Sequence, residues 1–214
     1  DSFGGGSTDD RRSLQTVRLN CTEEWAFETG EYIQAAPAVA GETVYIVRFD
    51  GILYSVDGQT GEQNWLSRET TRLNSAPSVR HETIFYGDDD GVLRAVDLEG
   101  ELRWDYEVDA GVRSSPSVSE DTVYFGDESG TFHAITTDGE SLWTFDTGDS
   151  IRTSPAIGDG YVAFGSRDNS VYALDLEGEE LWSHETGGSV VSSPAIIDGR
   201  LYVGSIDWSL YAFE

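Results

Sequence analysis

The chain has 214 residues, which is enough for one large all-β domain or two small domains. Forty acidic side chains face 13 basic ones, so the formal net charge is -27 at pH 7, and every basic side chain is an arginine. A surface this acidic repels nucleic-acid phosphates and excludes a nucleic-acid-binding role. The six Trp, ten Tyr and nine Phe residues argue against an acidic disordered chain.

The acidic residues are spread along the whole chain instead of gathering in one place. A cation-binding protein would cluster them, whereas adaptation to molar salt tolerates charge that is distributed over a globular surface. We therefore favour an origin in an extreme halophile, with cation binding as the alternative.

Residues 1–20 are predicted to be a flexible tether, because the opening DSFGGGSTDD is rich in Gly, Ser and Asp. Such a segment follows the lipid-modified cysteine of exported lipoproteins, so it predicts an extracellular, cell-surface protein with a lipid anchor upstream of residue 1. A glycosylation sequon at Asn20 adds weak support. The alternative is an arbitrary start of the sequence. No apolar run approaches the ~18 residues of a membrane helix, and the single Cys21 excludes an intrachain disulfide framework.

Residues 21–214 are predicted to form one domain, because a tryptophan recurs through them with a period of about 39 residues. The recurring tryptophans are Trp25, Trp65, Trp104, Trp143 and Trp182. A period near 40 residues with several short strands in each repeat is typical of propeller blades.

Each repeat contains the same four predicted strands. The first is centred on a proline, the second is rich in β-branched and aromatic residues, the third is apolar and the fourth carries the tryptophan, with Asp-Gly pairs at the turns. The second strands are predicted at Thr43–Val47, Thr83–Gly87, Thr122–Gly126, Tyr161–Gly165 and Leu201–Gly204. The pattern predicts an all-β, five-bladed β-propeller of four-stranded antiparallel blades.

The order of the strands suggests how the ring closes. The sequence begins with a fourth-type strand, Glu24–Glu28, and ends with a third-type strand, Leu210–Phe213. Pairing the two would complete the last blade and remove its open edge. We therefore predict that the N-terminal strand closes the ring on the C-terminal blade, and that the protein is a monomer. The alternative is a larger propeller cut at an arbitrary point.

One segment carries a family resemblance. The sequence SVDGQTGEQNW from Ser55 to Trp65 resembles the tryptophan-docking segment of PQQ-like (WD40-like) repeats, and Ala95–Trp104, Ala134–Trp143 and Ala173–Trp182 repeat it one residue shorter. That family includes quinone-dependent dehydrogenases and the propeller lipoprotein of outer-membrane assembly. Its members usually have seven or eight blades, so five is a departure. The resemblance implies a propeller whose tryptophans pack between blades, a structural role.

The dehydrogenases of this family imply adjacent cysteines, a calcium site and a catalytic aspartate, and this sequence has no matching set. His81, His133 and His184 fall at different repeat positions and form no metal pair. We therefore expect no enzymatic activity, no cofactor, no metal site and no catalytic residue. A fragment of a quinone-dependent dehydrogenase is the third hypothesis.

The candidate binding face carries the loops that vary between repeats. Two of its arginines, Arg113 and Arg152, share one repeat position and could focus an anionic group, unless each pairs with a local acid. Trp208 stands at a loop tip where other repeats have Gly, Asn or Ser, and it could share a patch with Phe49 across the closed ring. The alternative is that Trp208 covers the seam between two blades. The face is predicted to include Gln34, Arg48, Phe49, Asn74, Arg113, Arg152, Arg167 and Trp208.

These residues favour a non-enzymatic scaffold that binds a protein or peptide partner at the cell surface. Recognition of this kind needs no titratable groups. The alternative is a propeller that binds a small molecule or carbohydrate at the mouth of the central channel.

Overall fold

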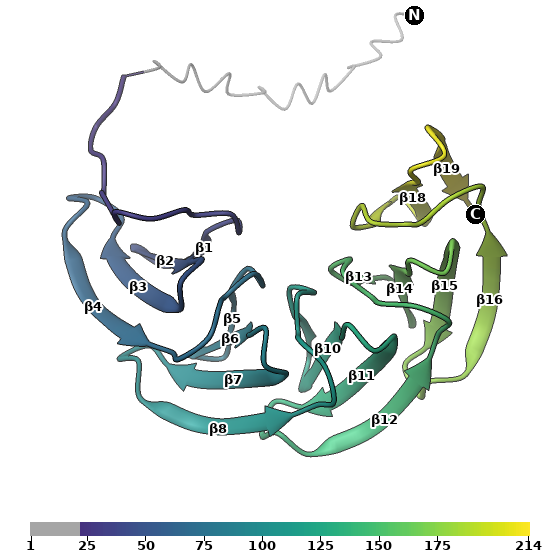
Figure 1. Ribbon diagram of the computed structural model, residues 1–214, viewed down its shortest axis with the longest axis horizontal. Coiled ribbons are helices and arrows are strands. Elements are labelled where there is room, and N and C mark those ends of the chain that lie inside the picture. The colour runs from purple at the N-terminus through teal and green to yellow at the C-terminus, as the bar shows by residue number, and fades with distance from the viewer. Residues whose placement is uncertain (1–21) are drawn as a thin grey trace, which may run out of the picture.

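The computed structural model describes residues 22–214, and its regular structure is entirely β (Figure 1). Its strands form five antiparallel sheets, four with four strands and one with three. The all-β class and the repeated antiparallel blades are thus confirmed. The tether predicted at residues 1–20, the sequon at Asn20 and Cys21 lie outside the described residues. No helix in the described range is long and apolar enough to span a membrane.

Within each blade, every strand pairs with the next one along the chain. Blade one consists of β1 (Ala38–Ala40), β2 (Thr43–Arg48), β3 (Ile52–Asp57) and β4 (Gln63–Arg68). Blade two consists of β5 (Ser78–Arg80), β6 (Thr83–Gly87), β7 (Val92–Asp97) and β8 (Leu102–Glu107). Blade three consists of β9 (Ser117–Ser119), β10 (Thr122–Gly126), β11 (Thr131–Thr136) and β12 (Ser141–Asp146). Blade four consists of β13 (Ala156–Ile157), β14 (Tyr161–Gly165), β15 (Ser170–Asp175) and β16 (Glu180–Glu185). Blade five has three strands, β17 (Ala195–Ile197), β18 (Arg200–Gly204) and β19 (Leu210–Phe213).

In blades two to four, the second and third strands are largely buried because a neighbouring blade covers each face of the sheet. All five residues of β6 are buried, for example, and Phe132 of blade three stacks on Phe164 of blade four at 3.9 Å. A strand that is covered on both faces is a continuous run of apolar residues, whereas a strand covered on one face alternates apolar and polar residues. The fourth strands lie at the outer edge and alternate between exposed and half-buried residues.

A β-bulge accompanies the tryptophan of each complete blade. In blade three, Trp143 lies opposite Ala134 and Ser141 lies opposite Ile135, so Leu142 is the extra residue. The same shift occurs in blades one, two and four. A bulge bends its strand and redirects side chains, and here it lies where the indole turns toward the next blade.

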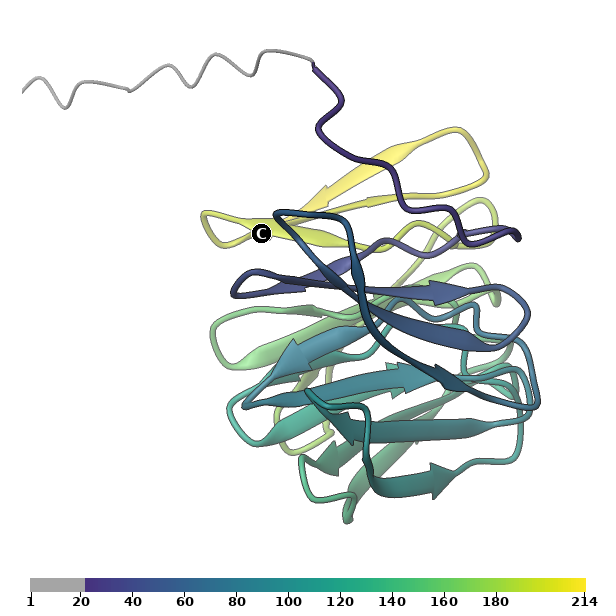
Figure 2. The same ribbon diagram turned by 90° about the vertical axis from the view of Figure 1, so that its left-hand side faces the viewer.

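The blades form an arc around a central opening, and the arc does not close (Figure 1). The N-terminal segment lies beside blade one, across the opening from β19. The side view shows the sheets stacked face to face (Figure 2). Glu24–Glu28 forms no strand, and blade five keeps three strands, so the predicted pairing with Leu210–Phe213 is not formed.

The N-terminal segment remains on blade one because its aromatic side chains pack there. Trp25 and Phe27 cover a cluster that includes Ile46 and Tyr54, and the Phe27 and Tyr54 rings meet edge to face at 5.3 Å. Leaving this cluster would return two large apolar side chains to water. The segment therefore covers the outer face of blade one and does not reach blade five.

Candidate binding site

Two kinds of loop meet on one face of the arc, which we call the loop face. They are the loops between second and third strands and the loops that lead from a fourth strand to the next blade. Backbone hydrogen bonds join them, as from Val108 N to Gly91 O at 2.8 Å and from Thr147 N to Gly130 O at 2.8 Å. The tight turns lie on the opposite face, the turn face.

The repeated tryptophans connect neighbouring units of the arc. Their indole N–H groups donate to backbone carbonyls of the next blade, from Trp65 to Leu98 at 2.8 Å and from Trp104 to Thr137 at 2.9 Å. Trp143 does the same, and Trp25 of the N-terminal segment donates to Gly58 of blade one at 3.1 Å. Each ring lies so close to a glycine that a Cβ would collide with it, as at Gly178 beneath Trp143 (2.6 Å). These contacts hold each indole against the next unit of the arc, which is a structural role.

Arg113 and Arg152 both pair with acidic side chains of the preceding blade. The Arg113 guanidinium donates to both carboxylate oxygens of Asp89, at 3.0 and 3.2 Å. Arg152 donates to both oxygens of Glu128, each at 2.7 Å, and this contact raises the pKa of the arginine above its usual value. The two arginines therefore clamp neighbouring blades together, and their charges are neutralised locally.

The other predicted residues near blades one and two are also engaged, with one exception. Arg48 pairs with Asp50, and Asn74 donates to Asp89 at 2.8 Å. The Phe49 ring lies 5.0 Å beneath the guanidinium of Arg72. The exception is Gln34, which is exposed and has no side-chain hydrogen bond among the described residues. Because the opening separates blade one from blade five, Phe49 and Trp208 do not form the shared patch that was predicted (Figure 1).

A different group of residues remains available on the loop face, over blades four and five. Arg167 is exposed and makes no side-chain hydrogen bond or ion pair within residues 22–214. Its carbonyl accepts from Ser189 Oγ at 2.9 Å, and the Ser189 carbonyl accepts from Ile206 N at 3.0 Å, so the three loops are adjacent. We call the exposed side chains here the blade-five patch, which comprises Arg167, Val191, Ile206 and Trp208.

Trp208 is the most exposed large apolar residue of the patch, at 99%. Its φ of 71° is in the left-handed region, where a bulky side chain is an outlier. The equivalent residues of the other blades are Gly51, Gly91, Gly130 and Asn169, and all of them have positive φ. The turn thus requires a residue in the left-handed conformation. In blade five this residue is Trp208, whose indole is exposed, and holding it in that conformation costs roughly 1–2 kcal/mol.

The loop that carries Trp208 is held in place by Asp207. Its carboxylate accepts from the Tyr211 hydroxyl at 2.6 Å, from Gly187 N at 2.7 Å and from Ser209 N at 2.9 Å. These hydrogen bonds, led by that of Tyr211, lower the pKa of Asp207 to about 2. The carboxylate is therefore ionised at neutral pH, and the indole is presented on a fixed loop.

In blade three, an aspartate of the loop between the second and third strands also contacts a side chain of the third strand, and this contact is more deeply buried. His133 Nε2 lies 3.0 Å from Asp127 Oδ2, and the imidazole stacks on Phe125 at 4.8 Å. Burial by itself would raise the pKa of Asp127, but the hydrogen bonds from His133, Ser129 and Thr131 outweigh it and hold the pKa below its usual value. In residues 22–214, no group of three or more His, Cys, Asp or Glu side chains is arranged to hold a metal ion.

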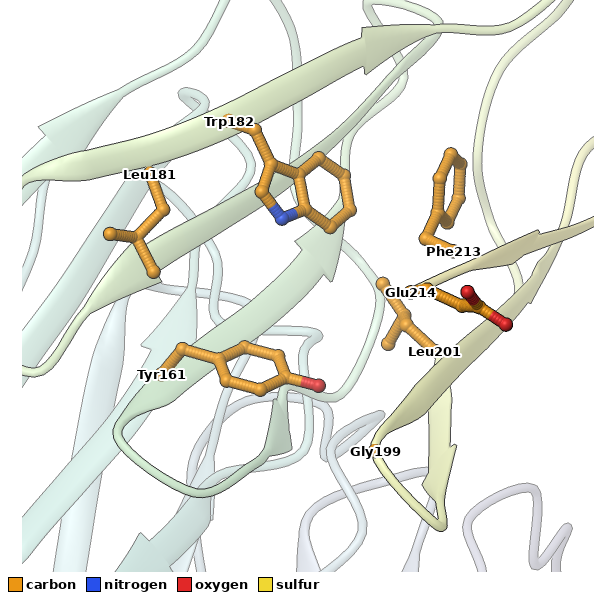
Figure 3. Close-up of a pocket in the computed structure, with 7 residues that line it drawn as sticks. All are labelled: Tyr161, Leu181, Trp182, Gly199, Leu201, Phe213 and Glu214. Carbon is orange, nitrogen blue, oxygen red and sulfur yellow. The ribbon is translucent and has the colours of Figure 1, made fainter.

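A small apolar pocket lies where blade four meets blade five (Figure 3). Its volume is about 110 Å³, and its lining includes Trp182 and Phe213, whose ring centroids lie 5.0 Å apart. Unlike the four docked tryptophans, Trp182 has no acceptor for its indole N–H among the described residues. The sequence pattern did not predict this pocket, because its lining comes from two different repeats.

The fold and its tryptophan-linked blades define an open β-propeller arc. The family model described as outer membrane protein assembly factor BamB matches residues 18–136, 80–154 and 128–214. The chain therefore belongs to this PQQ-type repeat family, and the predicted resemblance is confirmed. A comparison with curated protein sequences finds no match.

Solved structures support the fold. BamB from Moraxella catarrhalis is 22% identical with a TM-score of 0.74, and the match covers 84% of this chain and 57% of that one. The computationally designed Ika8 protein is 18% identical with a TM-score of 0.76, over 83% and 57% of the two chains. The designed Ika4 protein is also 18% identical, with a TM-score of 0.62, over 68% of this chain and 92% of that one. The chain thus spans 57% of the length of the first two.

Proposed function

We propose that this chain is a non-enzymatic scaffold, exported to the cell surface, that binds a partner protein through the blade-five patch. The observation that carries the proposal is Trp208, a fully exposed indole on a strained but fixed loop. Hydrogen bonds through Ser189 link this loop to that of Arg167, an arginine with no ion pair among the described residues. Tryptophan and arginine are the residue types that most often dominate binding energy at interfaces.

The composition of the patch suits recognition of a protein. Val191 and Ile206 are exposed apolar side chains on adjacent loops, and Arg167 offers a cation to a carboxylate of the partner. The chain has a net charge of -27, so most of its surface repels acidic groups. An arginine without an acidic partner supplies a local positive charge that attracts an acidic group of the partner. Membership of the family described as an outer-membrane assembly factor supports a protein partner and a location outside the cytoplasm.

The test is a binding measurement with a partner recovered by photo-crosslinking from position 208. We expect Trp208→Gly to weaken binding about 30-fold, equivalent to about 2 kcal/mol, and Arg167→Gln to weaken it by a smaller factor. Glu140→Gln on the turn face is the matched control and should leave affinity unchanged. Equal loss from Glu140→Gln, or no loss from Trp208→Gly, would place the site elsewhere.

We also propose that the fold requires high salt. The mutual repulsion of distributed carboxylates is screened over about 3 Å at 1 M salt but over about 30 Å at 0.01 M. The melting temperature should therefore fall steadily as salt is lowered from molar concentrations. A melting temperature independent of salt would refute the halophile hypothesis.

A further inference from the structure

A larger pocket lies between blades three and four on the turn face, opposite the face of the blade-five patch, and we call it the junction pocket. Its volume is about 480 Å³. Blade three contributes the β9–β10 turn and the start of β10, and blade four contributes the β13–β14 and β15–β16 turns. The polar side chains that line it are Ser119, Glu120, Thr122, Tyr124, Asp159 and Glu177.

The junction pocket carries negative charge without a positive partner. Glu120, Asp159 and Glu177 are acidic, and none of the described lining residues is basic. Within the described part of the chain, none of these three carboxylates forms a salt bridge. Ile157 and Leu176 add apolar surface to the lining. Because a cleft with charges of one sign and low-dielectric walls focuses its field inward, the pocket attracts a cation.

Tyr124 gives the pocket an unfilled hydrogen-bonding position. The residue is only 3% exposed and its ring lies 6.0 Å from that of Trp143, yet its hydroxyl makes no hydrogen bond of normal length and angle within residues 22–214. Burial raises the pKa of this hydroxyl most, and the nearby Thr122 hydroxyl lowers it. Glu177 and Glu120 raise that pKa further, so both carboxylates act on the hydroxyl. A buried polar group without a partner is costly, and a donor from a ligand would remove that cost.

Blade two shows which cation fits at this place. Its strand β6 begins with Thr83, at the repeat position of Thr122, and the guanidinium of Arg103 donates to the Thr83 hydroxyl. Arg103 is the extra residue of the β-bulge beside Trp104. In blade three the extra residue is Leu142, which does not line the pocket. Blade two thus supplies a guanidinium from its own bulge, and the bulge of blade three does not.

The equivalent pocket between blades one and two provides an internal comparison. It is formed by the same repeat positions, since it is lined by Thr43, Tyr45 and the bulge residue Asn64. One of its described lining residues, Glu99, is acidic, against three in the junction pocket. A cation should therefore prefer the junction pocket.

We propose that the junction pocket binds the guanidinium group of an arginine from a partner protein, through the carboxylates of Glu120 and Glu177 and the hydroxyl of Tyr124. A guanidinium presents five N–H donors in a planar fork that matches carboxylates, whereas the ammonium of lysine is more strongly hydrated. The net charge of -27 favours a partner with a basic surface. This site goes beyond the proposed function and lies on the other face, so either proposal can fail without the other.

The probe is arginine with both ends capped, titrated into the full chain in molar salt and followed by the NMR shifts of backbone amides. We expect saturable shifts at residues 119–122, 158–160 and 176–177, with a Kd on the order of 1 mM. Capped citrulline has the same shape without the charge and should not bind, and capped lysine should bind about threefold more weakly or worse. Absence of saturable shifts at these residues, or equal binding of citrulline or lysine, would overturn the proposal.

Substitutions in the pocket should weaken binding without unfolding the chain. Tyr124→Phe removes only the hydroxyl, and Phe85 is the natural residue at this position of blade two. Glu177→Gln removes one exposed carboxylate. Each should raise the Kd of capped arginine about threefold to tenfold. Glu140→Gln, on the same face but outside the pocket, is the matched control. Unchanged affinity in both pocket variants, or an equal loss in Glu140→Gln, would place the cation elsewhere.

The strongest test fills the pocket from within the chain. Leu142 is 52% exposed, so Leu142→Arg leaves the core intact. The new guanidinium should reach Thr122 as Arg103 reaches Thr83, and binding of capped arginine should be lost. Leu142→Gln is the matched control and should bind as the wild type does. Full binding in Leu142→Arg, or an equal loss in Leu142→Gln, would contradict the proposed site.

Discussion

The two ends of the arc differ in how far their end blades are covered from solvent. At blade one, Trp25 and Phe27 cover the outer face, and the Trp25 indole makes the same hydrogen bond to a backbone carbonyl as the tryptophans between blades. At blade five, Leu210 and Trp208 are exposed, and the indole of Trp182 has no acceptor among the described residues. The comparison teaches that a short extended segment is enough to cover a blade, and within residues 22–214 blade five has no such cover.

The sharpest test compares one residue type at one repeat position. Leu93→Ala in blade two should lower the free energy of unfolding by about 2–5 kcal/mol, because it leaves a cavity in a fully buried site. Leu210→Ala in blade five should change it by less than about 0.5 kcal/mol. Urea denaturation at constant molar salt measures both. Equal losses would mean that the face of blade five is covered in solution.

Removing the Trp25 side chain, which covers blade one, should have the next largest effect on the free energy of unfolding. Trp25→Ala deletes a half-buried indole and its hydrogen bond to Gly58, so we expect a loss of about 2 kcal/mol. Trp208→Ala serves as the control, since it removes an indole that has no cover. If both variants unfold at the same denaturant concentration as the wild type, the N-terminal segment does not stabilise blade one.

Replacing Trp208 by the residue of the equivalent position in blade four should have the smallest effect on stability, with the opposite sign. Trp208→Asn should raise the free energy of unfolding by about 0.5 kcal/mol, because Asn tolerates the left-handed conformation better than Trp. The same variant should weaken partner binding. A marked loss of stability would show that the indole packs against the protein in solution.

Acid should distinguish the buried acidic contact of blade three from the exposed one of blade five. The pKa values of both Asp127 and Asp207 are lowered in the folded state. Each therefore contributes stability above the unfolded value of about 3.9, and this contribution is lost as the pH falls through the folded pKa. For Asp207 the loss falls between about pH 4 and about 2. Chemical denaturation from pH 7 to pH 2 should show a weaker acid dependence in Asp127→Asn than in the wild type. An unchanged dependence would show that this contact does not contribute.

Much of the fold could be predicted because it depends on local patterns that repeat. The tryptophan period gave the number of repeats, and the Asp-Gly turns and β-branched runs placed the strands. Closure was predicted wrongly, because the aromatic pair Trp25 and Phe27 suits the cover of blade one as well as the last strand of blade five.

The candidate site was harder to predict because side-chain partners come from different repeats. Arg113 and Arg167 were both predicted to lie on the binding face, but within residues 22–214 only Arg113 forms an ion pair, with Asp89 of the neighbouring blade. Trp208 could be singled out, because a bulky residue at a position of Gly and Asn departs from the repeat. The exposure of Leu210 could not, since its sequence context matches four buried equivalents.

The repeated tryptophan-to-carbonyl contact also determines how the molecule comes apart. Every blade is fastened mainly to its immediate neighbours, so cooperativity passes along the arc in nearest-neighbour steps, as in linear repeat proteins. Blades two to four each have two neighbouring blades, whereas the blades at the ends of the arc have one. Under heat or mechanical load the arc should therefore come apart blade by blade from its ends, and not in a single step.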